Sequence, residues 1–132
     1  MNTKLFKYGY HDTTISKTII ENNKVIFIFN KGIYNLDDSG NETSLTGPCT
    51  LTILFDSNVE NAFDTITVTI VKKKNGTFMA DVEKLYQKNT FDNLEVSDVY
   101  FSKFNNTILL DVGKDDYKLL LYVSNCIDVL FD

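Results

Sequence analysis

The chain has 132 residues, of which 43% are apolar and 23% charged, and its formal net charge is −5. This length fits one domain with one core, and the apolar content is too high for a disordered chain. All 13 basic residues are lysines, so the chain lacks the arginines that make most bidentate contacts to phosphate and guanine, and we expect no nucleic-acid partner.

No apolar run approaches the roughly 20 residues that a membrane-spanning helix needs, so we expect no membrane association. Residues 1–8 lack the apolar segment of a secretory leader, which predicts a cytoplasmic protein. Cys49 and Cys126 stand in apolar, strand-like runs, as buried free thiols of a reducing compartment do. The sequence leaves open whether the two are paired.

His11 and Asp12 form the first candidate site, because His11 is the only histidine of the chain. An imidazole beside a carboxylate is typical of a general base or a metal ligand. Neighbouring residues of an extended strand point to opposite faces, so Asp12 is expected to be badly placed to orient His11. The alternative is a turn before the first strand, in which both side chains satisfy backbone groups.

Four segments show the patterns of strands. Residues 49–55 and 65–71 alternate apolar residues with threonines, which predicts a sheet covered on one face and wet on the other. Residues 25–29 and 119–123 are apolar throughout, which predicts central strands covered on both faces. Turn signals between such runs indicate antiparallel neighbours, at Asn22-Asn23, Asn75-Gly76 and Asn105-Asn106.

The polar segments 36–48 and 56–61 are predicted to be surface loops. The first carries the acidic candidates Asp37, Asp38 and Glu42. An EF-hand loop beginning at Asp37 would need glycine at position 42 and glutamate at position 48, where the chain has Glu42 and Pro48. A weak cation site and a solvated turn remain the two interpretations of this stretch.

The segment 80–89 is the one predicted helix, with Val82, Leu85 and Tyr86 at helical spacing and Asp81 at its N-terminus. The competing interpretation is an irregular strand. The sequence therefore predicts a mainly β fold, an antiparallel meander that forms a sandwich or a partly open barrel with one short helix, in a single domain over residues 1–132.

Two further groups are candidates for binding. Asp115 and Asp116, with Asp111, form an acidic cluster that is expected at the end of a hairpin. Aromatic residues alternate in two stripes, for which core packing is the preferred interpretation and an exposed recognition surface the alternative. The stripes are Phe6, Tyr8 and Tyr10, and Tyr100, Ser102 and Phe104.

The order of these features resembles a group of small, uncharacterised bacterial proteins, some of them immunity-type partners of toxins. His11-Asp12 opens a strand, a hairpin ends in residues 25–32, a polar loop leads to strand 49–55, and a helix precedes a C-terminal meander. The resemblance implies no catalytic residues, and it points to the binding of another protein.

The resulting prediction is a non-enzymatic protein-interaction domain, such as an immunity-type inhibitor, whose acidic balance suits a basic protein partner. No catalytic residue, metal site or cofactor is expected. One alternative is a small-ligand binder or enzyme with a pocket near His11, and another is an oligomer-forming module that uses an exposed edge strand. The candidate binding residues are His11, Asp12, Asp37, Asp38, Glu42, Asp115 and Asp116.

Overall fold

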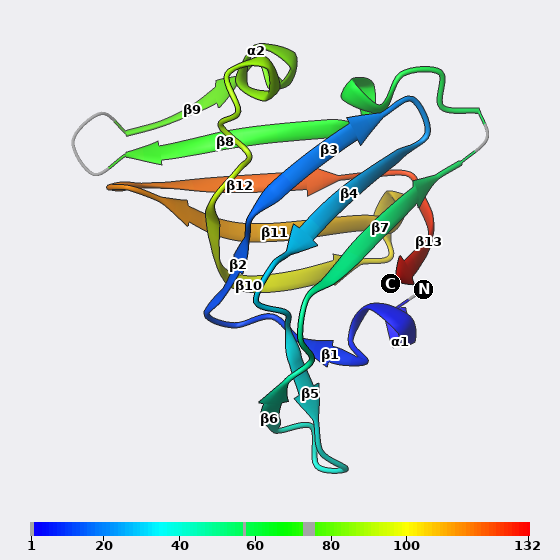
Figure 1. Cartoon of the computed structure of the whole chain (residues 1–132). Coiled ribbons are helices and arrows are strands. Elements are labelled where there is room, and N and C mark those ends of the chain that lie inside the picture. The colour runs from blue at the N-terminus through cyan, green and yellow to red at the C-terminus, as the bar shows by residue number, and fades with distance from the viewer. Residues whose placement is uncertain (1, 57, 73–75) are drawn as a thin grey trace.

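The computed structural model describes residues 2–56, 58–72 and 76–132, which form antiparallel sheets with short helices (Figure 1). The helices are α1 (Asn2–Leu5), α2 (Val82–Gln87) and the 3₁₀ turns η1 (Ala62–Thr65) and η2 (Phe104–Asn106). The strands are β1 (Tyr8–Gly9), β2 (Thr13–Ile15), β3 (Lys17–Glu21), β4 (Lys24–Phe29), β5 (Tyr34–Leu36), β6 (Glu42–Leu45), β7 (Cys49–Phe55), β8 (Ile66–Lys72), β9 (Gly76–Ala80), β10 (Leu94–Ser102), β11 (Thr107–Lys114), β12 (Tyr117–Val123) and β13 (Cys126–Phe131).

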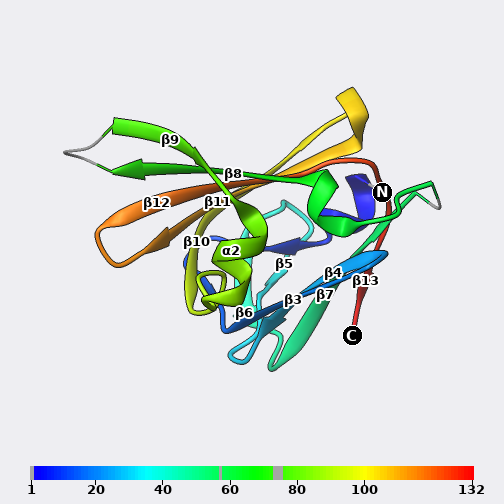
Figure 2. The same ribbon diagram turned by 90° about the horizontal axis from the view of Figure 1, so that it is seen from above.

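Two of the sheets pack face to face as a sandwich, as Figure 2 shows from above. One sheet has six strands in the order β2-β10-β11-β12-β8-β9, and the other has four in the order β13-β7-β4-β3. Both sheets end in edge strands, so among the described residues the fold is an open sandwich and not a closed barrel. The core lies between the sheets, where Phe27 and Ile53 of one meet Leu110 and Leu119 of the other.

The chain crosses from the six-stranded sheet to the four-stranded sheet at a bend at residue 16. Strand β2 belongs to the six-stranded sheet and β3, which begins one residue later, to the four-stranded sheet. The Ser16 N–H donates to Ile28 O across this bend at 2.7 Å. A second passage follows β12, where Asn125 adopts a φ of +57° before β13 begins. Asparagine tolerates this left-handed conformation better than most residues, so a turn forms there.

The four predicted strands are present, with one correction to their burial. Strand β7 has the predicted bounds, whereas β8 begins at Ile66, because Thr65 ends η1 and is buried instead of exposed. The all-apolar strands β4 and β12 are central in their sheets, but each is fully buried on one face only. Ile26 and Ile28 of β4 and Leu120 and Tyr122 of β12 lie half-buried on the outer faces. The all-apolar patterns of these two strands predicted a second layer of structure over the outer faces, and the described residues do not form such a layer.

The predicted loop 36–48 contains a strand. Strands β5 and β6 pair with each other, β5 also pairs with β1, and together they form a three-stranded arm below the sandwich (Figure 1). Every residue of β6 is exposed. Its sequence therefore has no alternation of buried and exposed positions, which is the signal that identifies a strand. Residues 46–48 remain a connection to β7, as predicted.

The predicted helix is α2, and it is shorter than expected because Ala80 ends β9. The Asp81 carboxylate accepts from the Lys84 N–H at 3.2 Å and so caps the helix as predicted. Asn89, with φ +59°, ends it in the left-handed conformation common after helices. The Tyr86 hydroxyl accepts from the Ile20 N–H at 3.1 Å, which ties α2 to the four-stranded sheet. Helix α1, which places Leu5 in the core, was not predicted.

Candidate functional site

His11 and Asp12 lie in a turn between β1 and β2, and their side chains do contact each other. Asp12 has a φ of +60°, so the two residues are not in extended backbone and do not point to opposite faces. His11 Nε2 lies 3.3 Å from Asp12 Oδ2, and His11 Nδ1 lies 2.7 Å from Ser97 O. The expectation that Asp12 cannot orient His11 is therefore wrong, whereas the expected turn is present.

The surroundings of His11 favour its protonated form. The hydrogen bond to Ser97 O and the charge of Asp12 raise the pKa of His11 above 6.5, and Glu42 and Asp98 contribute more weakly in the same direction. The imidazole is 64% exposed, however, so solvent screens these charges. The imidazolium held in this way ties the turn of residues 11–12 to Ser97 of β10.

Glu42 reaches this cluster from the arm. Its side chain lies over Gly9 so closely that a Cβ at position 9 would stand 2.8 Å from Glu42 Cγ. The glycine therefore lets β6 of the arm approach β1 without a clash. The structure thus brings together three of the predicted site residues, His11, Asp12 and Glu42, which the sequence assigned to two separate segments.

Asp37 and Asp38 lie in the turn between β5 and β6, at the tip of the arm (Figure 1). Asp37 Oδ1 accepts from the N–H groups of Ser39 and Asn41, both at 2.9 Å. This carboxylate closes its own turn, which is the solvated-turn interpretation of the stretch. Among the described residues, no group of three or more histidine, cysteine, aspartate or glutamate side chains is arranged to hold a metal ion.

The second acidic cluster is divided between two places. Asp115, with φ +55°, and Asp116 form the turn between β11 and β12, as predicted. Asp111 lies further along β11, opposite Leu120 of β12, and so belongs to the face of the sheet and not to its end. The hairpin end carries the charge expected of a soluble turn, and Asp111 needs a separate explanation.

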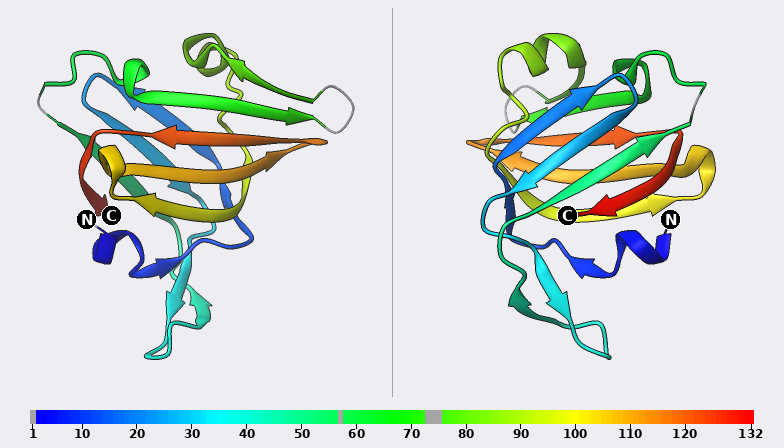
Figure 3. Two further views of the ribbon diagram at one scale, coloured as in Figure 1. Left: turned by 180° about the vertical axis from the view of Figure 1, so that it is seen from behind. Right: turned by 45° about the vertical axis from the view of Figure 1, so that its right-hand side comes forward.

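That face is the outer side of the six-stranded sheet, to which the sequence analysis assigned no role. In Figure 3, left, the sheet is seen from behind and no other element crosses it. Two rows of paired residues run across its strands. The first row is Tyr100, Leu109, Tyr122 and Thr67, and the second is Asp98, Asp111, Leu120, Thr69 and Met79. We call these nine residues the outer face.

The centre of the outer face is apolar and only partly exposed. Leu109, Leu120 and Tyr122 are half-buried among their neighbours, and Tyr100 and Met79 at the sides are exposed. Large aromatic and aliphatic side chains side by side on an uncovered sheet are typical of surfaces that bind other proteins. Of the predicted aromatic stripes, Tyr100 and Phe104 are therefore surface residues, whereas Tyr8 and Tyr10 pack into the interior and Phe6 is exposed.

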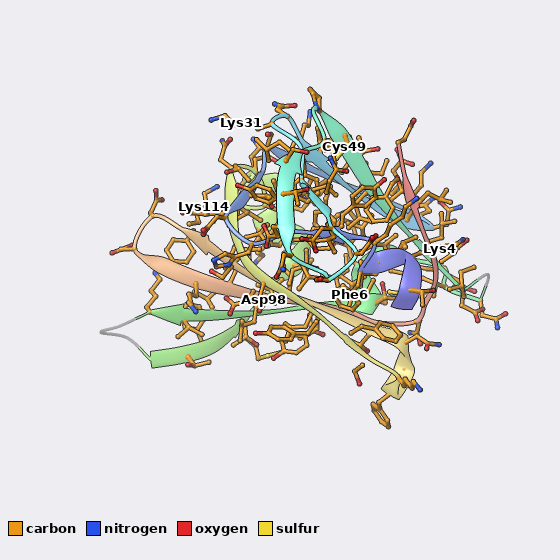
Figure 4. All side chains as sticks on the ribbon, turned by 90° about the horizontal axis from the view of Figure 1, so that it is seen from below. Lys4, Phe6, Lys31, Cys49, Asp98 and Lys114 are labelled. Carbon is orange, nitrogen blue, oxygen red and sulfur yellow. The ribbon has the colours of Figure 1, made fainter. Side chains whose placement is uncertain are left out.

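Two carboxylates make this surface acidic. A hydrogen bond and the charge of Asp98 raise the pKa of Tyr100 above 10, because both favour the protonated phenol. Asp111 Oδ1 is buried and has no hydrogen-bond partner among the described residues. Lys118 Nζ lies 3.5 Å from this oxygen, but without the geometry of a hydrogen bond. An unsatisfied buried oxygen costs free energy, so Asp111 is unfavourable for the stability of the isolated protein. Figure 4 marks Asp98 on β10.

Of the predicted site residues, Asp115 and Asp116 line a cavity, whereas His11 lines none of the three larger cavities. A cavity of about 410 Å³ lies beside the start of β13, between Asp56, Asn58 and three asparagines in left-handed conformations, Asn105, Asn106 and Asn125. Two others, of about 140 and 370 Å³, lie beside Cys49 and beside Asp115 and Asp116. None of the three is lined by His11. The alternative of a ligand pocket near His11 thus gains no support from the geometry.

No family model, curated protein or solved structure matches this chain. Among the described residues, no helix is long and apolar enough to cross a membrane. Cys49 and Cys126 are both free thiols, the first half-buried and the second buried. Burial raises the pKa of Cys126 to about 12, so this thiol is inert in the folded protein.

Only part of the outer face could be predicted from the sequence. The apolar pattern of strand 119–123 indicated that both of its faces are covered by other residues. Leu109 and Asp111 gave no signal by themselves, since the pairing of β10, β11 and β12 decides which residues become neighbours. The acidic candidates at chain turns were easier to see in the sequence, but the structure explains most of them as turn residues.

Proposed function

We propose that this chain is a non-enzymatic protein-interaction domain that binds a basic protein through the outer face, in the manner of an immunity-type inhibitor. The observation that carries the proposal is the uncovered apolar centre of a six-stranded sheet, where Leu120 and Tyr122 belong to a strand patterned for burial on both faces. A partner that covers these residues would supply the missing layer.

Charge supports a basic partner. Asp98 and Asp111 lie in the outer face, and Lys118, whose Nζ lies 3.5 Å from Asp111 Oδ1, is the one lysine that β12 contributes. The whole chain has a net charge of −5, which favours encounter with cationic proteins and repels nucleic acids. Two unpaired thiols are in keeping with action in a reducing compartment such as the cytoplasm.

The test combines capture with a charge reversal on the face. The immobilised protein is incubated with a native lysate of its source, and bound proteins are eluted by salt and identified by mass spectrometry. The Kd of each purified candidate is then measured for the wild type and for Asp98→Lys with Asp111→Lys. We expect the double variant to weaken binding of a basic partner at least about tenfold, a loss of about 1.4 kcal/mol.

The matched control is Asp38→Lys with Glu60→Lys, which makes the same change in net charge at exposed positions away from the outer face. Its Kd should stay within about twofold of the wild type. Recovery of no partner, or equal losses in the two double variants, would contradict the proposal. Circular dichroism of both variants checks that they are folded.

A further inference from the structure

The four edges of the two main sheets are not equally protected. An edge strand exposes unpaired N–H and C=O groups to which another strand can add, and proteins usually block such edges. The edges here are β2 and β9 of the six-stranded sheet, and β3 and β13 of the four-stranded sheet. Three of them are closed by features that the structure describes.

Strand β3 is closed by side chains that cap its backbone. The Thr18 N–H donates to Asp92 Oδ1 at 3.0 Å, and the Ile20 N–H donates to the Tyr86 hydroxyl at 3.1 Å. Thr18 and Ile20 are two residues apart, so their N–H groups point to the same side of the strand. The free edge of β3 is therefore occupied by α2 and the segment that follows it.

Strand β13 is interrupted and charged. Its pairing with β7 shifts register between Cys126 and Asp128, and the Asp128 carboxylate accepts from the Val129 N–H at 2.9 Å. Lys4 Nζ lies 2.9 Å from the same carboxylate, and Figure 4 shows Lys4 beside this strand. A bulge and an ion pair are two of the devices that block edges. Strand β2 has only three residues before the chain bends at Ser16.

Strand β9 has none of these protections. Its sequence, Gly-Thr-Phe-Met-Ala, contains no charged residue and no proline, and it pairs with β8 in unbroken register. Its backbone pairs with β8, and no side chain among the described residues forms a hydrogen bond with it. Met79 is 66% exposed and Phe78 is also exposed. Figures 1 and 3 show β9 as the uppermost strand of the sheet, with its long edge free.

We propose that β9 pairs with β9 of a second copy of this chain, in antiparallel orientation about a two-fold axis at Phe78, and joins the two six-stranded sheets into one continuous sheet. In this register Phe78 lies opposite Phe78 of the other copy, and Thr77 lies opposite Met79. Apolar and aromatic cross-strand pairs of this kind stabilise antiparallel sheets. A two-fold interface is closed, so the pairing ends at a dimer.

Charge complementarity favours the second copy as the occupant. Lys72, which pairs with Gly76, lies at one end of β9, and Asp81 and Glu83 follow the other end. Antiparallel pairing brings the lysine end of each copy to the acidic end of its mate, twice per dimer. Parallel pairing would instead bring each Lys72 next to its own equivalent, which is unfavourable. Met79 belongs both to the outer face and to β9, but the dimer does not require the outer face to bind a basic protein.

The test measures the oligomeric state by sedimentation equilibrium from about 10 µM to about 1 mM chain. The range extends to high concentration because a five-residue strand buries less surface than a standard interface, so the dimer is expected to be weak. We expect a concentration-dependent dimer for the wild type. Thr77→Lys with Met79→Lys places like charges opposite each other across the axis and should weaken dimerisation at least about tenfold. The control, Thr14→Lys with Gln87→Lys, has the same charge change at exposed sites outside β9 and should dimerise as the wild type does.

A charge exchange tests the orientation. Lys72→Glu alone and Glu83→Lys alone should each weaken the dimer, and the two substitutions together should restore it, because they recreate opposite charges across the interface. A wild type that remains a monomer over the whole concentration range would overturn the proposal. So would a dimer that tolerates lysines at positions 77 and 79, or a double exchange that fails to restore it. Thermal unfolding of dilute samples checks that every variant is folded.

Discussion

The protonation of His11 is set by two acceptors, one of them its neighbour in the turn, Asp12. The Nδ1 of His11 faces a carbonyl oxygen, Ser97 O, and its Nε2 faces a carboxylate oxygen, Asp12 Oδ2. Both partners are acceptors, and a neutral imidazole has a single N–H to donate. Only the imidazolium can bond to both at once, and for this reason the folded protein favours the protonated form.

We predict that His11 titrates above 6.5 in the folded protein, mainly because of Ser97 O and then Asp12. Since the folded pKa exceeds the unfolded one, the stabilisation is fully present below the unfolded pKa and is lost as pH rises through the folded pKa. NMR can follow the Hε1 proton without ambiguity, because His11 is the only histidine. Asp12→Asn should lower the pKa, and Asp64→Asn on η1 should leave it unchanged. A folded pKa at or below 6.5 would refute this account.

Asp111 is the residue whose replacement should stabilise the isolated protein. Its buried Oδ1 lacks a hydrogen bond, and aspartate is unfavourable in the middle of a strand. We expect Asp111→Thr to increase the free energy of unfolding by about 1 kcal/mol in urea denaturation at pH 7. Asp98→Thr is the control, because Asp98 accepts from the Val99 N–H at 2.9 Å and should give no gain. A loss of stability in Asp111→Thr would show that the contact with Lys118 outweighs the unsatisfied oxygen.

Only part of the cluster of His11, Asp12 and Glu42 could be predicted from the sequence. It singled out His11 and Asp12 and identified the turn that they form, but it assumed extended backbone between them. The contact between the two side chains depends on the positive φ of Asp12, which the pattern of neighbouring residues does not predict. The proximity of Glu42 depends on the pairing of β1 with β5 and of β5 with β6, which is a property of the whole fold.

Among the elements, the segment after α2 depends on a single lysine. Lys114 Nζ donates to three carbonyl oxygens, those of Asn89, Thr90 and Asp92, at 3.4, 3.2 and 2.8 Å. The positive charge at the end of β11 also suits the C-terminal end of the helix. Asp92 in turn caps Thr18 of β3. One side chain thus fixes the loop that closes an edge of the other sheet.

We therefore expect Lys114→Met to lower the free energy of unfolding by about 2 kcal/mol, because it removes charged hydrogen bonds while keeping the aliphatic stem. Hydrogen exchange of the Thr18 and Ile20 amides should accelerate in the same variant. Lys118→Met, on the neighbouring strand, removes only a loose ion pair and should change stability by less than about 0.5 kcal/mol. Equal effects of the two substitutions would contradict the anchoring role.

The elements that the sequence predicted well are those with one buried side. Strand β7 alternates apolar residues with threonines and has the predicted bounds, and α2 has its apolar residues at helical spacing with an aspartate cap. Two of the elements that were missed, α1 and β6, are four residues long. A segment of that length is too short to show a period, and its conformation is decided by the neighbours against which it lies.

For the molecule as a whole, the sequence predicted an antiparallel β domain, and the sandwich alternative is the one that the structure has. It could not predict strand order, since the pairing of β2 with β10 and of β13 with β7 joins segments that are far apart in the chain. The same limit hid the outer face, whose members come from separate strands. The apolar pattern of 119–123 predicted a strand covered on both faces, whereas the described residues bury only one face of β12.

The buried thiol of Cys126 can report how cooperatively the sandwich unfolds. Cys126 begins β13 at the passage between the sheets, where it is buried, and its Sγ donates to Val123 O at 3.1 Å. If the two sheets unfold together, this thiol can react only in the globally unfolded chain. In a Cys49→Ser variant, the rate at which a thiol reagent modifies Cys126 at pH 8 then reports the free energy of unfolding.

We expect the free energy from Cys126 labelling to agree with that from urea denaturation within about 1 kcal/mol. In the reverse variant, Cys126→Ser, the half-buried Cys49 should react faster and with little dependence on urea. A Cys126 protection well below the global value would mean that β13 detaches alone from β7, in spite of the Lys4–Asp128 ion pair that holds it. Because β13 is an edge strand, that outcome would identify it as the first part of the fold to open.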